Sequence, residues 1–301
     1  MKIAFIVLAH KNPDQLGRLI RKLISKDSAF YIHIDKKSNF SDFKSELSKL
    51  ANFTKITLLP RTNSYWGGPG IVTATLHGLD KTLNDGNYNR IVLLSGQDYP
   101  IKSMNYIFDF FENNKGKNFI QYFKLPSEIW NDGGLSRIKN YHYRIFGKEY
   151  TDPPVSEPIH LYSKMFYKIL KLRFRKPREF PEGLQPYGGF QWWRITAEAA
   201  KEIMNFIDKR PDYLEYHKYS GGVDEIFFQT ILLNSKNDTL LNSLVNDDLT
   251  YIEWKNKPNP EILTKSDFET IKKTNALFAR KFDFRIDSEI LDMIDKQILV
   301  P

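Results

Sequence analysis

Residues 2–14 read KIAFIVLAHKNPD. The first eight of these form a continuous β-forming run, as expected of a strand that is buried on both faces of a sheet. The next five are polar and include Pro13, which is typical of a turn that leads into a helix. Apolar residues then recur at helical spacing, at Leu16, Leu19, Ile20, Leu23 and Ile24. A strand, a turn and a helix in this order begin a unit that builds a parallel sheet.

The same alternation continues over the first hundred residues. The pattern predicts further strands over residues 30–34, 56–59 and 91–94, and helices over residues 43–50 and 71–83. A repeat of about 25 residues between strands is typical of a Rossmann-like α/β fold. No G-x-G-x-x-G follows the first strand and no Walker A motif occurs, so the classical dinucleotide and P-loop sites are disfavoured. Near the C-terminus, the pattern predicts a helix over residues 268–278.

The composition excludes several classes of protein. The chain has 301 residues with 41% hydrophobic and 27% charged side chains, which is ordinary for a globular domain. It has no cysteine, which excludes a disulfide scaffold, a thiolate metal site and a cysteine nucleophile. The net charge of +8 favours anionic partners, although such an excess is also unremarkable at this length. The first apolar run is too short for a signal sequence or a membrane span, so we expect a cytoplasmic protein.

Residues 161–178 are strongly basic. Lysine and arginine alternate there with apolar residues, at Lys164, Lys168, Lys171, Arg173, Arg175, Lys176 and Arg178. One interpretation is a basic amphipathic helix that contacts an anionic membrane surface. The other is the solvated face of a helix that packs on the core, and the sequence leaves both open.

Polar residues follow several of the predicted strands. His10, Asp35, residues 64–68 and Asp98 all lie just past a strand or in the turn after it. In parallel α/β sheets, ligands bind at this end of the strands, and an acid after the second strand commonly accepts hydrogen bonds from a ribose. His10 and His33 have no third ligand at metal-like spacing, so a zinc site is not expected.

Two further groups of residues suggest chemistry. None of the 21 aspartates forms an Asp-x-Asp pair, so a nucleotide-sugar transferase on this sheet would need Lys or Arg to neutralise the leaving diphosphate. Asp224 and Glu225 follow a glycine turn, either as acids at a helix start or with one of them as a general base. Trp192, Trp193 and Trp254 could stack on sugars or lie in the core.

Taken together, the motifs resemble the core-2/I-branching enzyme family, which includes β-1,6-N-acetylglucosaminyltransferases and peptide O-xylosyltransferases. They appear in the family's order at residues 6–11, 31–38, 66–68, 94–103, 224–225 and 277–282. The resemblance implies an α/β fold of the GT-A type with a mixed central sheet, a Rossmann-like nucleotide-binding half and no Asp-x-Asp motif. We expect a single domain over residues 1–301, with a nucleotide-binding half at 1–120 and an acceptor and catalytic half at 121–301.

The resemblance also implies roles for individual residues. Glu225 matches the catalytic base, and Arg280 and Lys281 match the pair that holds the diphosphate. The other expected donor-binding residues are Ala9, His10, Asp35, Ser64, Tyr65, Trp66, Asp98 and Lys257. The expected acceptor-binding residues are Trp254, Asp224 and Trp193.

The implied activity is an inverting, metal-independent transfer of GlcNAc or xylose from a UDP-sugar to a hydroxyl of a glycan, without a cofactor. The sequence has none of the cysteines of the animal enzymes, and we expect it to have neither their membrane anchor nor their stem. We therefore expect a role in surface polysaccharide assembly, with a lipid-linked glycan as acceptor at the inner membrane face and no nucleic acid partner. The alternatives are a non-catalytic carbohydrate-binding module and an NAD-type oxidoreductase.

Overall fold

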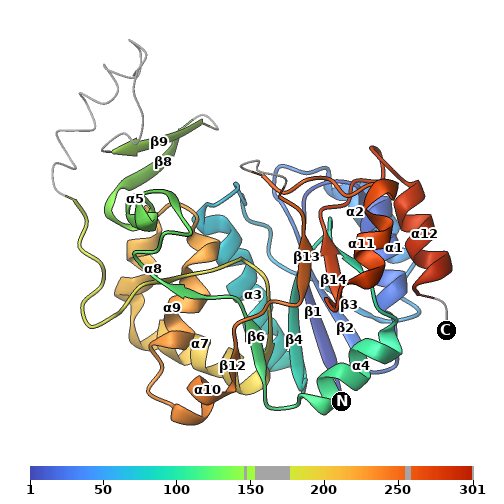
Figure 1. Cartoon of the computed structure of the whole chain (residues 1–301), viewed down its shortest axis with the longest axis horizontal. Coiled ribbons are helices and arrows are strands. Elements are labelled where there is room, and N and C mark those ends of the chain that lie inside the picture. The colour runs from blue at the N-terminus through green and yellow to red at the C-terminus, as the bar shows by residue number, and fades with distance from the viewer. Residues whose placement is uncertain (146–147, 153–176, 255–258, 300–301) are drawn as a thin grey trace.

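A seven-stranded mixed sheet forms the centre of the molecule (Figure 1). The computed structural model describes residues 1–145, 148–152, 177–254 and 259–299. In sheet order the strands are β12 (Leu244–Val245), β6 (Asn118–Ile120), β11 (Trp193–Thr196), β4 (Arg90–Ser95), β1 (Ile3–Ala9), β2 (Ser28–Ile34) and β3 (Lys55–Leu58). The strands β4, β1, β2 and β3 are parallel, and β11 runs antiparallel to both β4 and β6. The predicted α/β fold with a Rossmann-like parallel half is therefore confirmed.

The strand β1 is buried on both faces, as its apolar run predicts. Ile3, Phe5 and Val7 belong to one hydrophobic core, whereas Ala4 and Ile6 belong to a second core on the other face. This division follows from the alternation of side chains along a strand.

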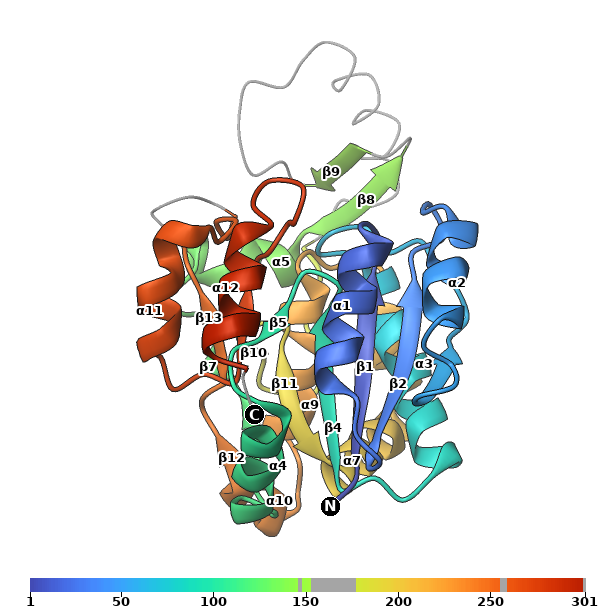
Figure 2. The same ribbon diagram turned by 90° about the vertical axis from the view of Figure 1, so that its right-hand side faces the viewer.

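Helices cover both faces of the sheet (Figures 1 and 2). The first core contains residues of α1 (Pro13–Leu23), α2 (Phe40–Ser48), α4 (Met104–Asn113), α11 (Phe268–Lys273) and α12 (Glu289–Gln297). The second contains residues of α3 (Pro69–Asp85), α7 (Ala197–Lys209), α8 (Pro211–His217), α9 (Phe227–Leu233) and α10 (Asp238–Ser243). Within the described residues, no helix has the length and apolar character needed to cross a membrane.

Three small sheets complete the fold. They are β13 (Thr250–Ile252) with β14 (Phe278–Arg280) and β5 (Tyr99–Pro100), β10 (Tyr187–Gly188) with β7 (Phe123–Lys124), and β8 (Tyr141–Ile145) with β9 (Lys148–Asp152). The helix predicted over residues 268–278 is wrong in its second half, because α11 ends at Lys273 and the chain then enters β14. Antiparallel pairing of β14 with β5 brings this late strand beside the loop that follows β4.

The basic stretch at 161–178 is largely outside the described residues, which resume at residue 177. Its last cation, Arg178, is buried, and its Nη1 donates hydrogen bonds to the Tyr219 carbonyl at 2.8 Å and to Ser220 Oγ at 3.1 Å. Its guanidinium also lies 3.7 Å from the centre of the Tyr216 ring. Arg178 therefore does not face a membrane surface.

Candidate functional site

A cavity of about 370 Å³ lies at the carboxyl ends of β1, β2 and β4. Residues from both halves of the chain line it, and among them are Ala9, His10, Asp35, Ser64, Trp66, Asp224, Glu225, Trp254, Arg280 and Lys281. The register of the sheet explains part of this grouping, because Ala9 is paired with Ile34, and Leu8 with Ser95. The turns after all three strands therefore begin at the same level.

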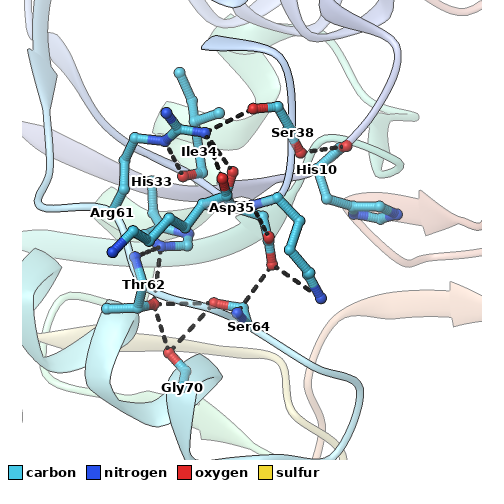
Figure 3. A network of polar contacts seen from close by, with 11 residues as sticks. His10, His33, Ile34, Asp35, Ser38, Arg61, Thr62, Ser64 and Gly70 are labelled. Atoms are coloured by element: carbon cyan, nitrogen blue, oxygen red, sulfur yellow. Dashed lines mark hydrogen bonds and ion pairs between the residues drawn. The ribbon is translucent and has the colours of Figure 1, made fainter. Parts of the chain in front are cut away.

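Asp35 joins two of the loops around the cavity (Figure 3). Its buried carboxylate accepts a hydrogen bond from the backbone N–H of Lys37 at 2.7 Å and another from Ser64 at 2.9 Å. The Lys37 ammonium lies 3.7 Å from the same carboxylate. Asp35 thus fixes the turn after β2 against the segment that leads to α3, while it also lines the cavity.

Arg61 organises the same turn from the other side (Figure 3). Its Nη2 donates to the carbonyl oxygens of Asp35 at 2.8 Å, Lys36 at 3.1 Å and Ser38 at 2.7 Å, and its Nε donates to that of Ile34 at 3.1 Å. Nε and Nη2 carry three N–H groups of the planar fork, so the four carbonyls share these donors, and one guanidinium holds them together. Sequence reasoning missed Arg61, because a single arginine in a loop carries no local signal of this role.

The two histidines near the strand ends, His10 and His33, both have lowered pKa values. His33 is buried, and its Nε2 accepts a hydrogen bond from the backbone N–H of Thr62 at 3.0 Å. Burial lowers the pKa of His33 to about 4, so the ring is neutral near pH 7. Partial burial, followed by the charges of Lys11 and Lys281, lowers the pKa of His10 as well. Among the residues that the structure describes, no group of three or more His, Asp or Glu side chains is placed to hold a metal ion.

Asp98 lies beneath the cavity and holds Arg280. The Asp98 side chain is only 1% exposed, and its carboxylate accepts from Ser95 N at 2.8 Å, Ser95 Oγ at 2.8 Å and Arg280 Nε at 3.0 Å. The Arg280 guanidinium also lies 4.2 Å from the centre of the Trp192 ring. Asp98 does not line the cavity itself, but its partners Ser95 and Arg280 do, so we expect it to position Arg280.

Arg280 and Lys281 make one part of the cavity wall positively charged. Lys281 follows Arg280, and burial together with the charges of Arg280 and Lys11 lowers its pKa. The Lys11 ammonium lies 2.7 Å from the carboxylate of Asp283. An anion between Arg280 and Lys281 would offset their repulsion, so this part of the cavity suits a phosphate or diphosphate group.

Two adjacent carboxylates, Asp224 and Glu225, lie elsewhere in the same cavity. A 3₁₀ turn (Val223–Glu225) carries them after Gly222, which has a φ of 56°. A side chain at Gly222 would also clash, since an added Cβ would lie 2.3 Å from Arg137 Nη1. Its positive φ therefore favours glycine at this position, and a larger residue would also displace the Arg137 guanidinium from Glu225.

Arg137 forms an ion pair with Glu225. Arg137 lies in α5 (Leu135–Lys139), and its Nη1 donates to Glu225 Oε2. Its guanidinium lies 3.8 Å from the centre of the Trp130 ring, which restricts its position further. Sequence reasoning missed Arg137, because 88 residues separate it from Glu225. Burial, and then the charge of Glu225, raises the pKa of Asp224 to about 7.

The aromatic predictions have mixed outcomes. Trp254 lines the cavity and stacks on Phe190 with ring centres 5.9 Å apart. Trp193 is fully buried and packs on Phe228 instead, so its assignment to the acceptor is wrong. Its neighbour Trp192 lines the cavity in its place.

Tyr65 and Lys257 are the remaining predicted donor-binding residues. Tyr65 is not part of the large cavity; it lines an adjacent cavity of about 140 Å³, and the Lys37 ammonium lies 3.8 Å from the centre of its ring. Lys257 lies outside the described residues.

Residues 3–275 match the family described as "Branch: Core-2/I-Branching enzyme". The chain belongs to this family. The resemblance inferred from the motifs is thereby confirmed, and the fold has the expected mixed central sheet.

Curated relatives of this core-2/I-branching family member are glycosyltransferases by name. The chain is 22% identical over 318 residues to Xylosyltransferase 2 of Rattus norvegicus, covering 98% of this chain and 33% of the relative. It is 25% identical over 312 residues to Beta-glucuronosyltransferase GlcAT14B of Arabidopsis thaliana, covering 99% and 66%. The chain therefore spans about a third of the length of the xylosyltransferase. A solved structure of S. aureus TarS 1–349 in complex with UDP is similar at 17% identity over 48% of this chain and 41% of that chain, with a TM-score of 0.30.

Proposed function

We propose that this protein is an inverting glycosyltransferase that moves a sugar from a UDP-sugar to a hydroxyl group of a glycan, without a metal ion. One observation supports this most strongly: a single cavity contains a cationic region at Arg280 and Lys281 and a carboxylate, Glu225, that is fixed by Arg137. Transfer from a nucleoside diphosphate sugar needs positive charge at the leaving group and a base at the attacking hydroxyl.

In the proposed reaction, Glu225 removes the proton from the acceptor hydroxyl. Arg137 fixes the carboxylate through Oε2, and we assign the proton-accepting role to Oε1. The acceptor oxygen forms a bond to the anomeric carbon from the face opposite UDP, and the bond from that carbon to the diphosphate oxygen breaks. Arg280 and Lys281 stabilise the negative charge of the departing UDP through charge-assisted hydrogen bonds.

Residues that line the cavity suggest where the donor and the acceptor bind. Asp35 and Ala9 lie at the ends of β2 and β1, where a uridine would bind, and Trp254 offers an aromatic face for an acceptor sugar. We propose GlcNAc or xylose as the transferred sugar. We extend the proposal to surface polysaccharide assembly on a lipid-linked glycan at the inner membrane face, which the basic composition supports.

Ligand-dependent stability tests the proposal first. UDP, UDP-GlcNAc, UDP-xylose, UDP-glucuronic acid and NAD are each added to the protein in EDTA and in Mn²⁺, and unfolding is followed by calorimetry. A ligand that binds only the folded state stabilises it by about 2.7 kcal/mol at 100 times its Kd. We expect UDP and one UDP-sugar to stabilise equally with and without metal. Dependence on Mn²⁺ would contradict the metal-independent mechanism, and stabilisation by NAD alone would favour an oxidoreductase.

Substitution of the base tests the mechanism. Glu225→Gln is expected to lower turnover by about 10²- to 10⁴-fold and to leave UDP binding unchanged. Glu46→Gln is the matched control, because Glu46 also pairs with an arginine, Arg21, but does not line the cavity. Turnover near the wild-type value in Glu225→Gln would refute the assignment. UDP-sugar binding without release of UDP from any donor would instead favour a carbohydrate-binding module.

A further inference from the structure

Asp224 is a buried carboxylate that the proposed mechanism leaves unused. Its side chain lines the cavity, the residue is 6% exposed, and its Oδ1 has no hydrogen-bond partner among the residues that the structure describes. It also does not cap a helix, since neither the 3₁₀ turn at Val223–Glu225 nor α9 has a side-chain cap. Burial of an unpaired polar atom is costly, so such an atom at a cavity wall indicates a ligand that supplies the missing partner.

The position of Asp224 indicates which ligand group this is. Its carboxylate interacts electrostatically with Glu225, Arg137 and Arg280. Glu225 is the proposed base and Arg280 holds the proposed leaving group, and the transferred sugar ring must occupy the space between these two. A carboxylate within reach of both therefore faces the donor sugar rather than the acceptor side to which the sequence motifs assigned it.

We propose that Asp224 accepts a hydrogen bond from a hydroxyl group of the donor sugar and thereby selects donors with a neutral sugar. This inference rests on the proposed glycosyl transfer. A sugar hydroxyl can donate to a carboxylate and can also accept from a protonated acid, so it suits Asp224 in either form. A donor sugar with its own carboxylate would meet like charge from Asp224 and Glu225, which disfavours uronic acid donors.

The protonation of Asp224 is consistent with this role. Burial, and then the neighbouring Glu225 charge, raise its pKa well above the ordinary range of an aspartate. A hydroxyl that donates to the charged form favours that form and lowers the pKa. Arg137 and Arg280 act in the same direction as such a hydrogen bond.

Steady-state kinetics of Asp224→Asn and Asp224→Ala test the inference. With the accepted neutral UDP-sugar we expect kcat/KM to fall by about 10- to 150-fold, the range for a hydrogen bond to a charged group, while the Kd of UDP, which has no sugar, stays within about twofold. Kinetics with UDP-sugars that each lack one sugar hydroxyl identify the hydroxyl that donates to Asp224. The deoxy donor without that hydroxyl should show the same kcat/KM with wild type and Asp224→Ala, because the interaction is already absent. Asp224→Asn should also improve the use of UDP-glucuronic acid relative to the neutral donor.

Asp248→Asn is the matched control. Asp248 is another buried aspartate with an unpaired oxygen, Oδ2, and its pKa is raised by burial to about 6, but it does not line the cavity. We expect this variant to alter stability without altering donor selectivity. Equal loss of UDP and UDP-sugar affinity in the Asp224 variants, or a change confined to the KM of the acceptor, would overturn the inference. Absence of turnover by wild type with every UDP-sugar would overturn the proposed function itself.

Discussion

The substitution Asp98→Asn tests whether Asp98 acts by positioning Arg280 or by binding the ligand itself. The amide of asparagine keeps one acceptor oxygen, whereas the Asp98 carboxylate now serves Ser95 N, Ser95 Oγ and Arg280 Nε. If the amide oxygen remains on Ser95 N, the amide N–H groups face the other two partners. The Ser95 hydroxyl can rotate to accept, but Arg280 Nε–H can only donate, so it loses its acceptor.

Asp98→Asn should reduce both the stability of the fold and the affinity for UDP, and the contacts of Asp98 indicate by how much. Breaking a buried pair costs about 3–5 kcal/mol, and the lower end applies because the Arg280 side chain is 16% exposed and remains stacked on Trp192. The entropy of unfolding is about 2.1 cal/mol/K per residue, so a loss of about 3 kcal/mol lowers the Tm of this chain by roughly 5 °C. A misplaced guanidinium also loses a charge-assisted hydrogen bond to the diphosphate. That loss of about 1.5–3 kcal/mol weakens UDP binding by about 10- to 150-fold.

Calorimetric titration with UDP and with uridine measures this effect. We expect Asp98→Asn to bind UDP more weakly and uridine as tightly as wild type, because only UDP carries the diphosphate. Asp295→Asn is the matched control: Asp295 accepts from Arg18 Nη2 at 2.9 Å and from Tyr99 OH at 2.8 Å, and it does not line the cavity. This variant should lose stability but not UDP affinity. Equal losses of UDP and uridine affinity, or wild-type affinity for UDP in folded Asp98→Asn, would refute the positioning role.

Four further predictions follow from the same contacts. Arg61→Lys replaces a guanidinium that holds four backbone carbonyls with a single ammonium, and it should weaken UDP binding by about 10-fold. Titration calorimetry measures the change, and unchanged UDP affinity would contradict the prediction. Arg137→Ala should lower kcat by about 10-fold or more with the donor KM unchanged, and Arg137→Lys should restore part of it. Trp193→Ala and Trp192→Ala should each lower the free energy of unfolding by about 3–5 kcal/mol, and Trp192→Ala should in addition weaken UDP binding, because Trp192 lines the cavity beside Arg280. His217 is fully buried with a pKa lowered to about 3, so the unfolded state binds its proton first as the pH falls below 6.5. Between pH 6.5 and 3, wild type should therefore lose up to about 1.36 kcal/mol per pH unit relative to His217→Phe, measured by denaturant unfolding.

The parallel half of the fold was predictable because its signals are local. Continuous apolar runs such as residues 2–9 identify buried strands, and the carboxyl ends of such strands locate the cavity. The helix predicted over residues 268–278 failed because β14 is determined by partners far along the chain. Tyr99, which pairs with Ala279, comes 180 residues earlier, and tertiary pairing outweighs local periodicity there.

Two of the expected site residues are buried behind the cavity wall. Asp98 and Trp193 are each next in sequence or in contact with residues that line the cavity, but neither lines it. Trp193 begins β11 and is fully buried in the second core, whereas Trp192, which packs in the same core, also lines the cavity. Side chains alternate between the two faces of a strand, so a shift of one residue decides which tryptophan lines the cavity. The spacing of the motifs does not fix this alternation at the end of a strand.

The supporting residues indicate that the cavity is organised before the donor binds. Arg280 is held by Asp98, Glu225 is held by Arg137, and the turn that carries Asp35 is held by Arg61. Charges fixed in advance need no reorganisation during the reaction, which is where electrostatic catalysis gains most. Of the carboxylates that line the cavity in the described part of the chain, Asp224 alone has a buried oxygen without a hydrogen-bond partner. If preorganisation is the rule in this site, the exception must be completed by the substrate, so the unpaired Asp224 is where donor selectivity is expected to arise.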